Sequence, residues 1–142
     1  MIREATNKDI LGLAILMGEL GYLTTNEEME QRFLNISENP YYKTIIYEED
    51  ERIIGMVGMM LGLRYEKNES YIRVVALVVD SKFRGLGIGT KLLLEAEKWA
   101  KEQGANMITL NSGNRNERNI AHQFYISRGF EGKATGFYKE LK

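Results

Sequence analysis

Arg84-Gly85-Leu86-Gly87-Ile88-Gly89 lies between an apolar run at residues 73–80 and an amphipathic stretch at residues 90–103. The apolar run is typical of a strand, and the amphipathic stretch is typical of a helix. Glycine lets the backbone come within hydrogen-bonding distance of an anion, and the first turn of a helix offers unpaired N–H groups and the positive end of its dipole. The glycine-rich stretch therefore predicts a phosphate-binding loop between a strand and a helix.

The spacing of these glycines excludes two nucleotide-binding motifs. A Rossmann fingerprint needs a third glycine at position 90, which is occupied by Thr90. A Walker loop needs Gly-Lys followed by Ser or Thr, whereas Lys91 is preceded by Thr90 and followed by Leu92. NAD(P) binding and P-loop chemistry are both excluded on these grounds.

The composition is that of an ordinary globular chain of 142 residues, which is long enough for one domain and too short for two. No apolar run reaches the roughly 20 residues of a membrane span, and the first residues lack a signal-peptide pattern. The absence of cysteine excludes disulfides, thiolate metal sites and a Cys nucleophile. We therefore expect a single domain over residues 1–142, a cytoplasmic location and no membrane partner.

The net charge of −1 hides an asymmetry between the two halves of the chain. Residues 1–75 carry 8 Lys and Arg against 13 Asp and Glu, and residues 76–142 carry 11 against 7. One explanation is that solvated faces simply differ in composition. The other is that the basic half binds phosphates while the acidic half attracts a cationic amine. Nucleic acid is not expected as a partner, because no basic stripe interleaved with aromatic residues is present.

Capping residues and periodicity predict the remaining elements. Thr6 with Asp9, and Thr25 with Glu28, have the spacing of capping boxes at helix starts. Strands are expected at residues 2–5, 43–48, 52–63, 71–80, 107–111 and 137–141, and helices after the two caps and at residues 90–103 and 118–128, with Gly21, Gly104 and Gly129 ending three of the helices.

Residues 71–111 have the order strand, loop, helix, strand. One helix in the crossover favours a parallel βαβ unit, and the short polar turns at residues 49–51 and 66–70 favour an antiparallel meander before it. The predicted fold class is therefore α/β with a mixed sheet. Two strands that diverge beside a helix N-terminus leave a cleft for an extended ligand, with its phosphate end at Gly87.

Two motifs resemble those of the GNAT N-acetyltransferase superfamily. Arg84, Gly87 and Gly89 match the pattern Gln/Arg-x-x-Gly-x-Gly/Ala of its acetyl-CoA loop. Residues 121–125 followed by Gly129-Phe130 look like its Ala-x-x-Phe/Leu-Tyr-x-x-x-Gly-Phe segment. The resemblance extends over nearly the whole chain, because the expected N-terminal helices and central strands also fall where such a domain has them.

The resemblance implies acetyl-CoA as the cosubstrate. It places the pantetheine arm along main-chain groups of the strand before the loop, and it places an oxyanion-stabilising N–H at Val78 or a neighbour. An amide near the start of the last helix would also contact the cosubstrate. The implied cofactor-binding residues are Leu77, Val78, Val79, Arg84, Gly85, Leu86, Gly87, Ile88, Gly89, Thr90 and Asn119.

Acetyl transfer to an amine needs a neutral amine, a stabilised oxyanion and protonation of the leaving thiolate. The chain has no Cys, and its only histidine, His122, has no obvious serine partner, so direct attack in a ternary complex is favoured over an acyl-enzyme. Tyr125 is the candidate general acid, because a phenol holds a proton at neutral pH. No metal is expected, because His122 has no second His and no Glu at helical spacing.

The chain departs from many members of the superfamily at two positions. Val75 stands where they place a glutamate base, which leaves a water relay, an amine delivered neutral, or a carboxylate such as Glu19 or Glu28. Arg118 stands where many have an Asn, and Asn119 or Asn114 could supply that amide instead.

The acceptor is expected to be a small-molecule or peptide amine, with a small cationic amine such as an aminoglycoside or polyamine favoured by the acidic first half. A neutral or anionic acceptor would instead make Arg73 a carboxylate anchor. A homodimer is also expected. The rival interpretation is a non-catalytic acyl-CoA-binding module of the same fold, because Val75 replaces the usual base. The candidate acceptor-binding residues are Glu19, Tyr22, Glu28, Arg73 and Asn111.

Overall fold

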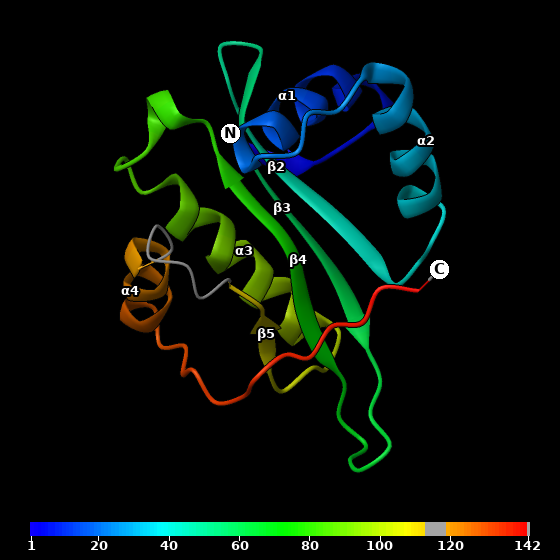
Figure 1. Ribbon diagram of the computed structural model, residues 1–142, viewed down its shortest axis with the longest axis vertical. Coiled ribbons are helices and arrows are strands. Elements are labelled where there is room, and N and C mark those ends of the chain that lie inside the picture. Colours follow the sequence, from blue (N-terminus) through cyan, green and yellow to red (C-terminus); the bar gives the residue numbers. More distant parts are fainter. Residues whose placement is uncertain (113–118, 142) are drawn as a thin grey trace. The chain divides into compact units, whose positions relative to one another are not determined.

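A computed structural model describes residues 1–112 and 119–141. By backbone packing, the chain divides into two compact units, Met1–Thr109 and Leu110–Lys142, and each is treated separately below. Figure 1 shows the elements along the chain.

The first unit is built on a mixed sheet whose strands follow one another in chain order (Figure 1). Its first four strands pair antiparallel, and the last strand runs parallel to its neighbour. The α/β class, with an antiparallel meander followed by a parallel βαβ unit, is therefore confirmed. The strands are β1 (Ile2–Glu4), β2 (Tyr42–Glu49), β3 (Arg52–Gly62), β4 (Tyr71–Val79) and β5 (Ile108–Leu110).

Both predicted capping boxes start helices of the first unit. Thr6 caps a 3₁₀ turn, and Thr25 caps α2, and the backbone N–H of each threonine donates to the carboxylate three residues later. Gly21 and Gly104 end α1 and α3 with φ angles of 105° and 75°, a left-handed conformation that favours glycine. The helical elements are η1 (Asn7–Asp9), α1 (Ile10–Leu20), α2 (Asn26–Ser37), η2 (Ser81–Phe83) and α3 (Ile88–Glu102).

Asp9 joins the first strand to the first helix. Its buried carboxylate accepts bonds of 2.8 and 2.9 Å from the Arg3 guanidinium and 2.7 Å from the Thr6 N–H. The Arg3 hydrogen bonds hold the pKa of Asp9 below its usual range, although burial opposes the shift. Asp9 is therefore a structural anion that stays charged and fixes the start of the first helix.

Helices cover both faces of the sheet. α1 and α2 bury one face through a cluster that includes Ile46, Met56 and Val78 from the central strands. α3 covers the opposite face, where its first turns lie against β3 at Gly55. The end of β4 therefore lies between two helical layers, and the loop that leaves β4 begins there.

The second unit contains α4 (Asn119–Ser127). The helix ends in a Schellman motif, because Gly129 has a φ of 91° and the Phe130 N–H donates to the Tyr125 carbonyl at 3.1 Å. The prediction of a strand at residues 137–141 is wrong, because these residues form no strand. The large apolar side chains of this segment stay exposed to solvent: Phe137, Tyr138 and Leu141 are 91%, 79% and 89% exposed.

Candidate functional site

The glycine-rich stretch forms a loop between the end of β4 and the start of α3, as the sequence predicts. Asp80 fixes where this loop begins. Its side chain is buried, accepts from the Lys82 N–H at 2.9 Å and pairs with Arg52 at 3.0 Å. Arg52 also lies over the Phe83 ring at 5.5 Å. Sequence reasoning missed this clamp, although an Asp directly after a strand is a usual start for a local side-chain turn.

Gly85 and Gly87 give the loop its shape. Their φ angles are 81° and 82°, and a Cβ built on either would meet nothing within 4 Å. The glycines are therefore required by the backbone conformation and not by crowding, and the space beside them is open. A backbone of this kind can wrap around an anion.

The first turn of α3 faces this open space. Gly87 is the N-cap, and intrahelical bonding begins with the Lys91 N–H donating to the Gly87 carbonyl at 3.1 Å. The N–H groups of Ile88 and Gly89 precede that bond and have no acceptor within the helix. Together with the helix dipole, they form a region that attracts a phosphate.

Gly55 on β3 sets the position of this helix end. A Cβ there would lie 3.1 Å from Ile88 and 3.1 Å from Leu92, which is tighter than ordinary contact. β3 and the first turns of α3 thus approach each other closely because position 55 has no side chain. This is the close packing that glycine inside a strand indicates.

Arg84 and Glu19 connect the loop to α1. The Arg84 Nε donates to the Val79 carbonyl at 3.2 Å, and its guanidinium lies 3.8 Å from the Glu19 carboxylate. Ser81 also donates to Glu19, at 3.3 Å. Glu19, which the sequence analysis assigns to the acceptor site, therefore contacts the glycine-rich loop. No local sequence signal marks this contact, because the partners lie more than 60 positions apart.

The end of β4 leaves main-chain groups for an extended ligand. β5 begins beside the start of β4, where the Ile72 N–H donates to the Met107 carbonyl at 2.9 Å, and it is only three residues long. Within the first unit, no strand therefore pairs with that edge of Leu77–Val79, where the Val79 carbonyl accepts from the Arg84 side chain. A free strand edge can bind an extended chain through its N–H and C=O groups.

Val75 is the extra residue of a β-bulge. Gly58 pairs with Ala76 and Met59 pairs with Val74, so Val75 has no opposite partner on β3. Its side chain is 56% exposed. A bulge redirects side chains and often lies next to a functional site, and this one lies between Arg73 and the free edge at Leu77–Val79. No carboxylate is supplied at this position.

Two acceptor candidates lie on or near the N-terminal helices. Tyr22 follows α1 and is 66% exposed. Glu28 accepts from the Thr25 N–H at 2.9 Å and lies 3.7 Å from Arg32. The bond from the Thr25 N–H is the main reason that the pKa of Glu28 falls below its usual value. Its carboxylate therefore serves as a helix cap, which makes it a weaker base.

Arg73 lies on the sheet face that α1 and α2 cover. It pairs with Met60, and Met60 pairs with Tyr42, so these three side chains share one face. Tyr42 is on the same face as Ile46 of the α1–α2 cluster, because the two are four residues apart on one regular strand. Arg73 is half-buried there.

The second unit holds the remaining candidates. Tyr125 on α4 is half-buried and makes edge-type contacts with the rings of Phe124 and Phe130, whose centroids lie 5.5 and 5.8 Å away. The Asn111 amide donates to the Tyr138 hydroxyl at 2.8 Å. Asn119 is the first residue of α4. Arg118 and Asn114 lie outside the described residues.

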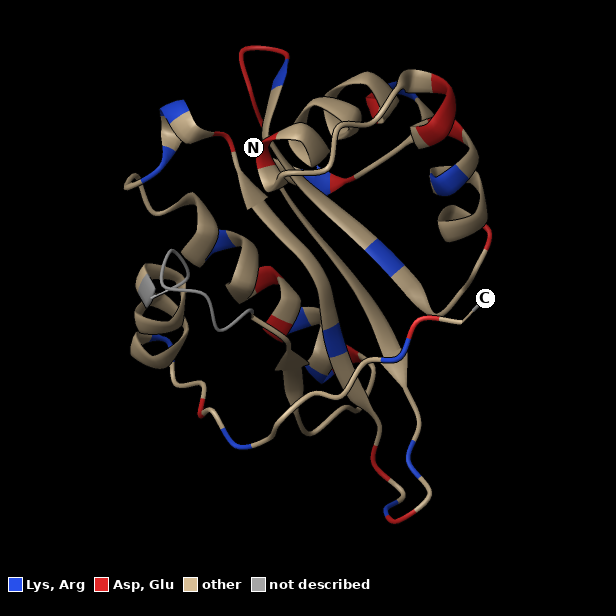
Figure 2. Ribbon diagram, viewed as in Figure 1, with Lys and Arg blue, Asp and Glu red and all other residues tan. Residues whose placement is uncertain are grey.

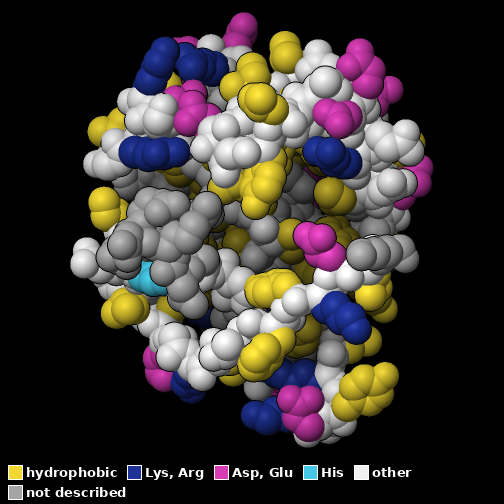
Figure 3. Space-filling model, viewed as in Figure 1, with side chains coloured by type: hydrophobic (Ala, Val, Ile, Leu, Met, Phe, Trp, Pro, Cys, Tyr) yellow, Lys and Arg dark blue, Asp and Glu magenta, His cyan; other side chains and the backbone are white. Residues whose placement is uncertain are grey.

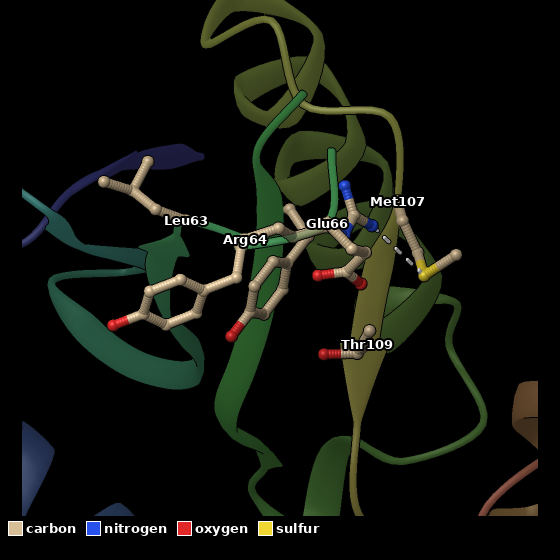
Figure 4. A pocket seen from close by; sticks show the side chains of 7 residues that line it. Leu63, Arg64, Glu66, Met107 and Thr109 are labelled. Carbon is tan, nitrogen blue, oxygen red and sulfur yellow. Dashed lines mark hydrogen bonds between the residues drawn. The ribbon is translucent and has the colours of Figure 1, made fainter. Parts of the chain in front are cut away.

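Figure 4 shows a pocket of about 300 Å³ at the hairpin that joins β3 and β4. Arg64 crosses it and donates to the Met107 sulfur at 3.7 Å, to the Glu69 carbonyl and to Asn106. This hairpin precedes β4 and the glycine-rich loop follows it, so the length of a nine-residue strand, about 30 Å, separates them. The pocket is therefore separate from the glycine-rich loop.

None of the helices described in residues 1–112 and 119–141 is long and apolar enough to cross a membrane. Over the same ranges, no group of three or more His, Cys, Asp or Glu side chains is arranged to hold a metal ion. Exposed apolar side chains lie scattered among charged ones on the face seen in Figure 3.

Comparison with known proteins adds to this geometry. Aminoalkylphosphonate N-acetyltransferase of Salmonella typhimurium is 26% identical to this chain, over 99% of this chain and 90% of that protein. A GNAT family acetyltransferase of Staphylococcus aureus has a similar structure, with a TM-score of 0.86, 33% identity and coverage of 99% and 98%. Glucosamine-6-phosphate N-acetyltransferase of Arabidopsis thaliana gives a TM-score of 0.83, 25% identity and coverage of 100% and 98%.

The family model for the acetyltransferase (GNAT) family matches residues 13–130. This range includes both the glycine-rich loop and the helix that carries Tyr125. The chain therefore belongs to the GNAT acetyltransferase family and is an acetyl-CoA-dependent N-acetyltransferase.

Proposed function

We propose that this enzyme transfers the acetyl group of acetyl-CoA to the primary amine of a small molecule by direct attack in a ternary complex. The observation that carries this proposal is the loop at Gly85 and Gly87, where two left-handed glycines and the first turn of α3 surround open space. The loop would hold the pyrophosphate of the cosubstrate through the N–H groups of residues 87–90. The Arg84 side chain would flank it.

The pantetheine arm would lie along the free edge of β4 at Leu77–Val79 and bring the thioester toward the bulge at Val75. The amine nitrogen would attack the thioester carbon, forming the C–N bond and a tetrahedral oxyanion, which would then collapse as the C–S bond breaks. The Val78 N–H or a neighbouring one would stabilise the oxyanion. Tyr125 would give its phenolic proton to the departing thiolate, and Asn119 would contact the cosubstrate.

The proton on the amine requires a different route. Glu28 caps a helix, and Glu19 contacts Arg84 and Ser81, so both carboxylates already have other partners. We therefore favour a water relay or an amine that binds in its neutral form. Either route predicts that turnover rises with pH as more of the free amine is deprotonated.

The acceptor is proposed to be a small amine. The two named relatives above act, by their names, on an aminoalkylphosphonate and on glucosamine 6-phosphate. The acidity of residues 1–75, which predicts a cationic acceptor, is a weaker guide, because Asp9 and Glu48 pair with Arg3. Other carboxylates lie on α2 and on the hairpin turns (Figure 2), and not on the strand face that α1 and α2 cover. A single domain, a cytoplasmic location and a homodimer stay predictions.

Initial-rate kinetics test this function. Free thiol release is followed over a matrix of acetyl-CoA and amine concentrations, with a panel of primary amines and mass spectrometry of the product. Lines that intersect in a double-reciprocal plot, together with an N-acetylated product, are expected for a ternary complex. Parallel lines would indicate an acyl-enzyme, and no acetylated amine from any class would contradict the proposed function.

A further inference from the structure

Arg73 differs from the other arginines of residues 1–112 because its guanidinium has no hydrogen bond or ion pair with any described residue. Four of them pair with carboxylates, and Arg64 donates to main-chain carbonyls and to Asn106. No hydrogen bond or ion pair forms between Arg73 and any described residue, although its side chain is half-buried. A guanidinium that loses water without gaining a partner is destabilising unless an anion binds to it.

The position of Arg73 relates it to the reaction. It lies on β4 two residues before the bulged Val75, a distance of about 7 Å along the strand. The free main-chain edge at Leu77–Val79 follows directly after the bulge. A short acceptor molecule could therefore place its anionic group on Arg73 and its amine beside the bulge.

Among the described residues, the sheet face around Arg73 supplies no carboxylate partner for it. A cavity of about 60 Å³ lies farther along this face, between the end of α2 and β2, and Tyr42 lines it whereas Arg73 and Met60 do not. Glu4, on the distant strand β1, pairs with Lys43 at 3.8 Å. Arg73 thus presents an uncompensated positive charge on the sheet face that α1 and α2 cover.

We propose that Arg73 is a specificity residue that binds an anionic group, a phosphonate or a carboxylate, on the acceptor amine. The inference rests on the proposed N-acetyltransferase function and adds the class of acceptor. Two N–H groups of the guanidinium donate to two oxygens of the anion, which orients the amine toward the thioester. The acceptor is therefore an amine that also carries an anionic group, and the anion binds Arg73 on the sheet while the amine is placed beside the thioester.

The test compares matched acceptors in the full-length enzyme. 2-Aminoethylphosphonate and β-alanine carry the anion, and propylamine and ethanolamine do not. For the wild type, kcat/KM is expected to be about 10- to 100-fold higher for the anionic pair, the range for a charged hydrogen-bonded contact. Methylphosphonate, an anion without an amine, is expected to inhibit competitively against the acceptor and not against acetyl-CoA.

The variants separate a specific contact from a general loss of charge. Arg73→Met should remove the preference for anionic amines over propylamine and ethanolamine, and Arg73→Lys should keep part of it. Lys101→Met removes one positive charge from α3, on the opposite face of the sheet, and should keep the wild-type preference.

Each outcome has a distinct meaning. Equal kcat/KM for anionic and neutral amines in the wild type would overturn the role of Arg73 and leave the acetyltransferase function intact. If Arg73→Met does not fold, the wild-type preference and the methylphosphonate inhibition still decide the proposal. If the wild type acetylates none of these amines and no other amine, the proposed function itself fails.

Discussion

Replacing Gly87 by alanine isolates the contribution of the loop backbone to acetyl-CoA binding. Gly87 has a φ of 82°, and a Cβ there meets no atom within 4 Å, so the substitution introduces conformational strain without a clash. An L-residue in this conformation costs about 1–2 kcal/mol. Because the free loop is exposed, we expect it to relax to negative φ and to regain the cradle shape only at that cost when the cosubstrate binds.

The expected result is a CoA dissociation constant about 5- to 30-fold higher than that of the wild type, measured by isothermal titration calorimetry. Gly104→Ala is the matched control. Gly104 ends the same helix with a φ of 75° and equally open surroundings, so it carries the same strain away from the loop. Its CoA affinity should be unchanged. A Kd for Gly87→Ala within twofold of wild type, or equal weakening by Gly104→Ala, would refute the reasoning.

Three further outcomes follow from the contacts described above. Tyr125→Phe keeps the ring packing on Phe130 and should lower kcat about 10²-fold with little change in the Kd for CoA, whereas wild-type turnover across the pH range would reduce Tyr125 to a packing residue. Asp9→Asn should lower the free energy of unfolding at pH 7 by about 1.5–3 kcal/mol, because charged hydrogen bonds to Arg3 are lost. Because the folded-state pKa of Asp9 is depressed, its contribution is present above the unfolded pKa of about 3.9 and fades as pH falls through the folded value, so urea titrations of the two proteins should converge in acid. A constant difference down to pH 2 would contradict this assignment. Gly55→Val should lower the free energy of unfolding by about 1–3 kcal/mol through overpacking against α3, and an unchanged urea midpoint would show that the contact is not tight.

The sequence predicts well where the signal is local. Thr6 with Asp9 and Thr25 with Glu28 form the expected capping boxes, since each box involves residues three positions apart. The glycine-rich loop also lies where the alternation of strand and helix patterns places it. Gly129 ends its helix as expected because the left-handed conformation needs glycine.

The features that the sequence did not predict depend on distant partners. The bulge at Val75 is set by the pairing of β4 with β3, and hydrophobic alternation does not reveal which residue is left over. Glu19 contacts Arg84 across more than 60 positions. The predicted strand at residues 137–141 rested on apolar residues that stay exposed, and a pattern alone cannot show whether a strand finds a partner.

The unpaired state of Arg73 also emerges only in three dimensions. The sequence offers Arg73 as one of several acceptor candidates, without showing that the other arginines of residues 1–112 are engaged. Strand register places it beside the bulge, and the ion pairs elsewhere show that it has no carboxylate partner among the described residues. Its role therefore depends on the whole set of contacts in the first unit.

The thermal stability of the wild type with CoA tests the central claim most directly, which is that the loop at residues 84–90 binds the pyrophosphate of the cosubstrate. CoA at about 100 times its Kd should stabilise the folded state by about 2.7 kcal/mol, which raises Tm by roughly 5–10 °C for a chain of this length. Pantetheine has the thiol arm without the pyrophosphate, so at the same concentration it should raise Tm far less. An unchanged Tm with saturating CoA, or equal stabilisation by pantetheine, would contradict the account.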